Sequence, residues 1–295
     1  MTHARRIEAD LWTRLPETHR WTGRGNAWTE ATRPGVRLHS FLEGPAILPS
    51  GDVLVADVAY GRIFRVTPNG TWSLAAEGGR PHALRPLADG RFAVADFEQG
   101  LVALDLATGN REVLADRVNT EAFRGLSDLA VAPNGDIWFT DSGRSSLTDP
   151  TGRLFCLRAD GRLERVLANA PYPNGVALSP DGGTVYVAMT RANAVWTVSA
   201  APAGPMGAMA GVFLQLSGGL GPDGLAVDAA GRLAVAQARA GRAYLFDALG
   251  DPVAEIRTPG GTWTTAVAFD GDTLLIVEAE DGAIWRADVA GLRAE

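Results

Sequence analysis

Six polar residues stand at corresponding places in six similar stretches of the chain, and their types suit a metal ion. Each stretch has a short apolar segment, a turn rich in Pro, Asp, Asn or Gly, and a second apolar segment. Fourteen residues before the end of the second segment, or fifteen where the turn carries an extra glycine, the chain has Glu43, His82, Ser127, Asn174, Asp223 and Thr264. Carboxylate, amide and hydroxyl oxygens are the ligands that hard divalent cations prefer.

The chemistry that these residues predict is an oxygen-ligated cation site. Glu43, Asn174 and Asp223 offer oxygen ligands, Ser127 offers a fourth, and waters complete the shell. Two carboxylates in a partly buried channel repel each other unless a cation balances them or their pKa rises. A single imidazole, that of His82, does not favour zinc. The cofactor predicted from the residues is therefore one divalent cation.

Each of these positions also has a plain structural interpretation. A polar residue before a strand can cap a turn, and His82 can line the channel without taking part in chemistry. The full set of six, with both an Asp and a Glu, favours the metal interpretation over capping. A second set of acidic residues differs, because Asp57, Asp96 and Asp141 end the second segments, and we expect them to accept hydrogen bonds from backbone N–H groups.

The elements that position the polar column are six copies of one repeat. The second segments end at residues spaced roughly 40 to 50 apart, the length of one four-stranded propeller blade; these end points are Asp57, Asp96, Asp141, Met189, Gln237 and Glu278. Short apolar runs bounded by glycines disfavour a helical solenoid. The sequence thus predicts an all-β fold, a six-bladed β-propeller with a central metal site where the innermost strands begin.

The two ends of the chain are expected to share one blade. After the sixth copy only residues 282–287 remain as strand material, so a fourth strand must come from the N-terminal region. We expect residues 1–40 to supply it, from 36–41 or from the segment around Leu11 and Trp12. Residues 41–295 then form the propeller, and the whole chain is a single domain.

Composition excludes several classes of function. The chain has 295 residues, 46% of them hydrophobic, and a formal net charge of −7 without a basic stripe, which argues against a nucleic-acid partner. One cysteine, Cys156, excludes an intramolecular disulfide framework and a cysteine-based zinc cluster. No run of 18 apolar residues and no signal-like N-terminus occur, so a cytoplasmic protein without a membrane partner is the expectation.

Four motifs in order resemble the senescence marker protein/gluconolactonase family. They are Glu43-Gly44-Pro45, Ser127-Asp128-Leu129 with the run that ends at Asp141, Pro173-Asn174-Gly175-Val176, and Pro222-Asp223-Gly224-Leu225. The likeness extends from about residue 40 to residue 285 and is strongest from Phe139 to Val198, where it resembles the bacterial lactonase and phosphotriesterase-like branch.

The resemblance implies a six-bladed propeller with one catalytic divalent metal: calcium by preference, or zinc, manganese or iron. By position, Glu43, Asn174 and Asp223 match three metal ligands of the family, and Asp223 is implied to act also as general base or nucleophile. Two positions depart from the family. Ser127 stands where most members have asparagine, and His82 replaces the Asn-Gly pair of many sugar lactonases, which weakens the case for a sugar substrate.

These observations predict a metal-dependent hydrolase, a lactonase that opens a small lactone. Asp223 and His82 are the expected catalytic residues, and Arg124, Thr264 and Asp128 are expected to contact the substrate. Arg144 shares with Arg124 a place in loops beside the third repeat, where either side chain could bind a carboxylate. Organophosphate or ester hydrolysis on the same site, and a non-catalytic propeller that binds a partner, are the alternatives.

Overall fold

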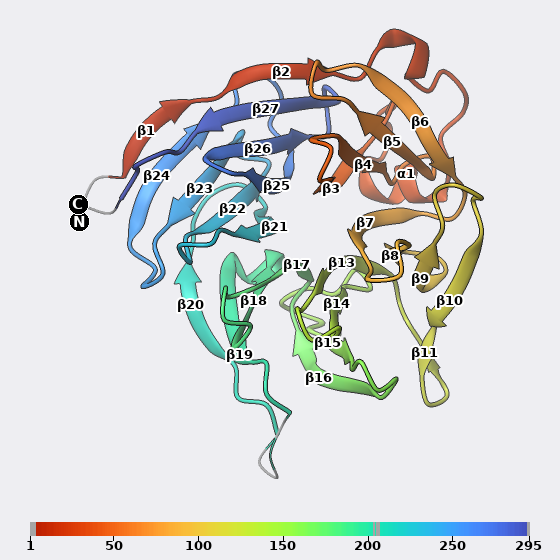
Figure 1. The fold of residues 1–295 in the computed structure, drawn as a ribbon, viewed down its shortest axis with the longest axis vertical. Coiled ribbons are helices and arrows are strands. Elements are labelled where there is room, and N and C mark those ends of the chain that lie inside the picture. Colours follow the sequence, from red (N-terminus) through yellow and green to blue (C-terminus); the bar gives the residue numbers. More distant parts are fainter. Residues whose placement is uncertain (1–3, 203, 205–206, 294–295) are drawn as a thin grey trace.

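The molecule is a closed ring of six β-sheets around a central axis (Figure 1). Its structure is a computed structural model that describes residues 4–202, 204 and 207–293. Each sheet contains four consecutive antiparallel strands or three with one strand from elsewhere. The six-bladed β-propeller predicted from the repeat is therefore confirmed.

The first four blades follow one another along the chain, and each pairs its strands in order from the axis outward. Blade one has β3 (Leu42–Ile47), β4 (Val53–Asp57), β5 (Arg62–Val66) and β6 (Trp72–Glu77). Blade two has β7 (Pro81–Pro86), β8 (Phe92–Asp96), β9 (Gly100–Leu104) and β10 (Arg111–Ala115). Blade three has β13 (Leu126–Val131), β14 (Ile137–Asp141), β15 (Gly152–Leu157) and β16 (Leu163–Ala170). Blade four has β17 (Pro173–Leu178), β18 (Thr184–Met189), β19 (Ala194–Ser199) and β20 (Gly211–Gln215).

The last two blades each gain a strand from the N-terminal region. Blade five has β21 (Gly221–Val227), β22 (Leu233–Ala238), β23 (Arg242–Phe246), β24 (Pro252–Arg257) and, parallel to β24, β1 (Arg5–Glu8). Blade six has β25 (Thr264–Asp270), β26 (Thr273–Glu278), β27 (Ala283–Asp288) and, antiparallel to β27, β2 (Asp10–Arg14). Only Ala9 separates β1 from β2, so one segment covers the outer edges of both blades. Residues 36–41, the other candidate for the closing strand, do not form a strand.

A short segment after β2 packs over one end of the channel. It contains the 3-10 helix η1 (Glu17–His19) and the helix α1 (Ala27–Thr32). Asn26 caps the N-terminus of α1, because its side chain accepts a hydrogen bond from the backbone N–H of Thr29. Trp28 of α1 meets Phe41 edge to face, with ring centroids 5.2 Å apart, and both belong to an apolar cluster with Trp263. The hairpin of β11 (Arg117–Val118) and β12 (Glu121–Ala122) lies between blades two and three, and the 3-10 helix η2 (Thr190–Ala192) follows β18. In the described residues, no helix is long and apolar enough to span a membrane.

The innermost strands of neighbouring blades pack against one another and bring their beginnings to the axis. In all six blades the pairing of the innermost strand with its neighbour shifts register near this beginning. Such a bulge places two residues opposite one and re-aims the side chains that it contains. The polar column of the sequence falls at these bulges in the first five blades.

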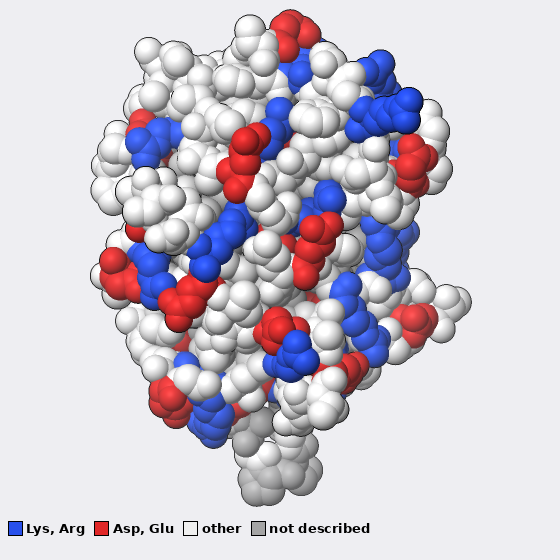
Figure 2. Space-filling view, turned by 90° about the vertical axis from the view of Figure 1, so that its right-hand side faces the viewer, with Lys and Arg blue, Asp and Glu red and all other residues white. Residues whose placement is uncertain are grey.

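The acidic residues that end the second strands hold the blade corners together. Asp57 accepts a hydrogen bond from the backbone of Phe41, Asp96 from Arg80, and Asp141 from Arg124. The expectation that these carboxylates bind backbone N–H groups is confirmed. On the outer face shown in Figure 2, arginine and acidic side chains lie next to one another in a mixed pattern.

Candidate metal centre and pocket

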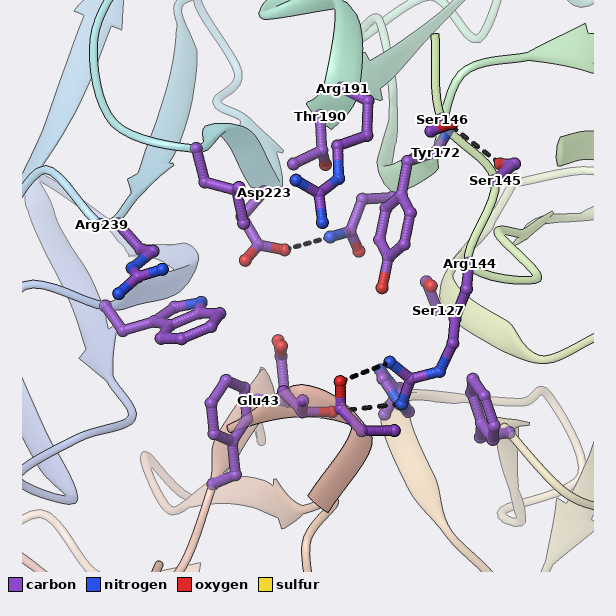
Figure 3. Close-up of a pocket in the computed structure, with 18 of the residues that line it drawn as sticks. Glu43, Ser127, Arg144, Ser145, Ser146, Tyr172, Thr190, Arg191, Asp223 and Arg239 are labelled. Atoms are coloured by element: carbon purple, nitrogen blue, oxygen red, sulfur yellow. Dashed lines mark hydrogen bonds between the residues drawn. The ribbon is translucent and has the colours of Figure 1, made fainter. Parts of the chain in front are cut away.

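A pocket of about 500 Å³ opens at the end of the channel that α1 partly covers. Five of the six residues of the predicted polar column line it, and they come from the first five blades: Glu43, His82, Ser127, Asn174 and Asp223. Figure 3 shows Asp223 and Glu43 facing each other across this space. The structure therefore brings together residues that the sequence separates by as many as 180 positions.

The sixth residue of the column, Thr264, is not in the pocket. It is fully buried, and its hydroxyl donates to the backbone carbonyls of Gln237 at 2.6 Å and Arg242 at 2.9 Å. Thr264 pairs with the last residue of the second strand, Glu278, as Leu42 does with Asp57. The hairpin of blade six is one residue shorter than that of blade one, so a fixed count back from the strand end goes one position too far and reaches the equivalent of Leu42 instead of Glu43. Thr264 is thus a residue of the blade core and not a substrate contact.

Arg124 is also outside the pocket, which corrects its expected role. Its guanidinium pairs with Glu121 at 3.0 Å and donates to the backbone carbonyl of Thr151 at 3.2 Å. The neighbouring loop carries Arg144 into the pocket instead. Of the two arginines that the sequence offered for a carboxylate, only Arg144 lines the cavity.

The three predicted metal ligands lie together because their strands approach closely. Asn174 donates its side-chain amide to Asp223, which places the two side chains in contact. Asn174 and Asp223 are each followed by a glycine at which an added Cβ would lie within 3 Å of the next blade's backbone, and Gly44 after Glu43 is the same. A larger residue at any of the three positions would push two inner strands apart.

Asp128 lies beneath the ligands and does not face the pocket. Its carboxylate accepts hydrogen bonds from the backbone of Leu129 at 2.8 Å and of Val176 at 3.0 Å, and Arg85 lies 3.7 Å away. It lines the small floor cavity that also touches Glu43 and Asp223. A substrate in the pocket is separated from Asp128 by the ligand layer, so its expected substrate contact is corrected to a supporting position under the site.

The surroundings of Glu43 and Asp223 disfavour the ionised form of both carboxyl groups. Burial raises the pKa of Glu43 well above its usual value, and the charges of Asp223 and Asp128 raise it further. Burial likewise raises the pKa of Asp223, with a further increase from Asp128. Arg85 offsets only part of the burial effect on the pKa of Asp128. A positive charge between Glu43 and Asp223 would relieve this repulsion.

The donor set fits a divalent cation with oxygen ligands. Glu43 and Asp223 supply carboxylates, and a half-turn of the Asn174 amide presents its oxygen where the nitrogen now lies. Ser127 lines the same space, and its hydroxyl lies 2.7 Å from that of Ser142. Within the described residues, no three Asp, Glu, His or Cys side chains have metal-binding geometry by themselves. A metal ion here would therefore need the Asn174 amide as a ligand in addition to the two carboxylates.

His82 is held as a neutral imidazole at the wall of the pocket. Burial, followed by the charges of Arg80 and Arg144, lowers its pKa to about 3. The ring stacks on Phe97 with centroids 5.7 Å apart, and its buried Nε2 has no hydrogen-bond partner among the residues that the structure describes. Burial of the ring disfavours its charged form, so His82 does not fit the proton-transfer part of its expected catalytic role. Because His82 lines the pocket, its neutral ring can contact a bound molecule.

A neutral His82 makes folding stability depend on pH in a defined direction. The folded pKa lies below the unfolded value of about 6.5, so the unfolded chain binds the extra proton and stability falls as pH drops from about 6.5 toward 3. At pH 5 this costs about 2 kcal/mol. We expect His82→Gln to lose about that much less stability than wild type between pH 7.5 and pH 5, measured by chemical unfolding at both values. Equal losses in the two proteins would show that His82 is protonated in the fold.

The upper wall of the pocket consists of residues outside the polar column. Aromatic side chains come from α1 and from the loops, and arginines come from three blades; together they are Trp28, Phe41, Phe97, Tyr172, Trp263, Arg144, Arg191 and Arg239. Of these eight residues, only Arg144 is expected from the sequence as a candidate for binding a carboxylate. The sequence does contain a usable signal, since each arginine follows the end of the second apolar segment of its repeat by two or three residues.

Comparison with known proteins gives a family match over most of the chain. The family model described as the SMP-30/gluconolactonase/LRE-like region matches residues 41–280. Among curated proteins, lactonase drp35 of Staphylococcus aureus strain USA300 is 28% identical over 260 residues, which cover 83% of this chain and 77% of that protein. The matched region includes every residue proposed above as a metal ligand.

Solved structures show the same fold. A gluconolactonase from Xanthomonas campestris has a TM-score of 0.73 at 24% identity and covers 86% of each chain. A calcium-binding protein, regucalcin, from Agrobacterium tumefaciens strain C58 also has a TM-score of 0.73 at 24% identity, with 87% of this chain and 91% of the other covered. At this level of identity the two structures support the propeller architecture alone.

Proposed function

The chain belongs to the SMP-30/gluconolactonase/LRE-like family, and on this basis we propose that it is a metal-dependent lactonase acting on a small lactone in the axial pocket. The observation that carries the proposal is the pair of buried carboxylates, Glu43 and Asp223, beside the Asn174 amide. Their raised pKa values mark a place where a cation is favoured, and calcium, an oxygen-seeking ion, suits these ligands. The lactonase name of the curated relative supports the reaction class.

The proposed ligands are Glu43, Asn174 and Asp223, with Ser127 as the fourth. A divalent ion held there supplies Lewis-acid polarisation of the lactone carbonyl oxygen and balances the charge that develops on it. The hydroxyl of Ser127 is shorter than the asparagine amide of most relatives, and it also contacts Ser142. We propose that Ser127 would interact with the ion through a bridging water, since a serine hydroxyl reaches less far than an asparagine amide.

Asp223 moves the protons of the reaction. Its carboxylate accepts a proton from the water whose oxygen attacks the carbonyl carbon, and it returns that proton to the ring oxygen as the ring C–O bond breaks. The product is the ring-opened hydroxy acid, which contains all the atoms of the lactone and of the attacking water. His82 lines the pocket as a neutral imidazole, so we assign it to substrate binding and not to proton transfer.

Titration of released acid with and without a chelator tests this function. On a panel of small lactones, we expect turnover to fall about a hundred-fold or more with EDTA and to return with calcium, manganese or zinc, because the carbonyl loses its electrophilic partner. The panel includes an open ester and an organophosphate as comparison substrates. Turnover that is insensitive to chelation, or absent from every lactone, would contradict the proposal.

A further inference from the structure

We propose that the pocket selects lactones that carry a second, ionised group, a carboxylate, through Arg144, Arg191 and Arg239. The inference rests on the proposed lactonase function and adds the charge class of its substrate. All three side chains line the pocket, and Figure 3 shows them distributed around the cavity that contains Glu43 and Asp223.

The three arginines occupy corresponding positions in consecutive blades. Each lies in the loop between the second and third strands of blade three, four or five, just after β14, β18 or β22. In blades two and six the corresponding loops carry Glu98 and Glu280. These two acids are neutralised, since Glu98 pairs with Arg80 at 2.8 Å and Glu280 pairs with Arg33. Positive charge therefore gathers at one half of the pocket mouth.

None of the three guanidinium groups forms an ion pair with any carboxylate of the described chain, whereas most other arginines do. The two carboxylates of the pocket, Glu43 and Asp223, are balanced by a divalent ion if the proposed function holds. His82 is neutral and adds no charge. The pocket then keeps the positive charge of three guanidinium groups that no carboxylate of the described residues pairs with, and an anionic ligand would balance it.

Aromatic rings hold each guanidinium group in place. Arg144 lies 6.0 Å from the ring centre of Phe97, Arg191 lies 5.7 Å from Tyr172, and Arg239 lies 5.1 Å from Trp263. All three rings line the same pocket. Arg144 also donates to the carbonyl of Ala31 and the hydroxyl of Thr32, both at 3.2 Å, which ties it to α1. An oriented guanidinium loses less freedom when it binds a carboxylate.

Several residues that line this pocket have a strained backbone conformation. In the described part of the chain, five non-glycine residues have positive φ, and three of them line the pocket: Arg144 at 58°, Tyr172 at 61° and Arg239 at 58°. A left-handed backbone at such a residue costs about 1 kcal/mol or more. Strain of this kind is found where the position of a side chain matters for function. Here it occurs at Arg144 and Arg239, and at Tyr172, whose ring contacts the guanidinium group of Arg191.

The arrangement gives a substrate two points of attachment. The lactone carbonyl reaches Glu43, Asn174 and Asp223 on the axis, and a carboxylate elsewhere on the molecule meets the arginines at the mouth. Guanidinium groups bind carboxylates through paired, charge-assisted hydrogen bonds. A cavity of about 500 Å³ accommodates a small lactone with such a substituent.

A matched pair of lactones tests the inference. One is γ-butyrolactone with a carboxylate on the ring carbon next to the ring oxygen, and the other has a carboxamide of the same shape. We expect wild type to prefer the carboxylate about tenfold or more in kcat/KM, mainly through KM. Arg144→Gln, Arg191→Gln and Arg239→Gln should each lower that preference about tenfold, because each removes a charged hydrogen-bond donor. Arg124→Gln, outside the pocket, is the control and should keep the preference.

Equal rates on the two lactones, or pocket variants that behave like Arg124→Gln, would overturn the inference while leaving the lactonase function intact. Calorimetric binding of both intact lactones to Asp223→Asn separates the two proposals, because it needs no turnover. Tighter binding of the carboxylate, lost in the arginine variants on this background, supports the anion site even if no lactone is hydrolysed. Equal affinity for the two, or affinity for neither, refutes it.

Discussion

Replacing Asp223 by asparagine is expected to lower kcat for lactone hydrolysis by about a thousand-fold or more, with the fold retained. Asparagine has nearly the same shape and keeps the contact with Asn174. It cannot accept the proton of the attacking water, and it removes one of the two charges that hold the cation. Proton transfer by a positioned carboxylate alone is worth about a hundred- to ten-thousand-fold. Steady-state kinetics at saturating metal measures the loss.

A matched control separates chemistry from folding. Asp228 lies in the same blade, accepts a hydrogen bond from Arg232 at 2.6 Å, and does not line the pocket. Asp228→Asn should retain kcat within about threefold, while both variants keep the thermal unfolding midpoint of wild type within a few degrees. Activity of Asp223→Asn close to that of Asp228→Asn would remove Asp223 from its assigned role.

Asp141→Ala is expected to destabilise the protein by about 3–5 kcal/mol, the usual result of stranding a buried charge. Asp141 is fully buried and accepts hydrogen bonds from the backbone of Arg124 and Gly125 and from the guanidinium of Arg153, the last at 2.7 Å. The substitution leaves Arg153 buried without its main partner and frees two backbone donors. Urea unfolding with a common slope measures the change.

The corresponding control removes an exposed pair. Asp116 contacts Arg117 at 2.8 Å with both side chains about half exposed, so Asp116→Ala should leave the urea unfolding midpoint almost unchanged because solvent screens the pair. If Asp141→Ala changed unfolding as little as Asp116→Ala, the carboxylates at the ends of the second strands would not stabilise the blades as the account requires.

The fold could be predicted from sequence because each blade repeats one local pattern. Short apolar strands and turn residues fix a hairpin locally, and six copies then demand a closed ring. The parallel pairing of β1 with β24 could not be predicted, since it joins residues almost 250 positions apart and depends on which outer edge is free. Thr264 was misplaced for a local reason, because a hairpin shorter by one residue changes the register without changing the polar pattern.

The floor of the site could be predicted better than its walls. Glu43, Asn174 and Asp223 follow from the repeat, since a bulge at each strand beginning turns them to the axis. The walls come from loops and from α1, whose paths depend on contacts across blades. Arg124 and Arg144 illustrate this, because both lie in loops of blade three and only Arg144, whose backbone has a positive φ, lines the pocket.

The metal content of the purified protein, after dialysis against calcium and removal of free ion, tests the central claim most directly. Elemental analysis should find about one divalent ion per chain in wild type and in Asp228→Asn. It should find much less in Glu43→Gln and Asp223→Asn, because each removes one of the two charges on the axis. No bound ion in wild type, or an ion retained equally by all four proteins, would contradict a metal centre built on Glu43 and Asp223.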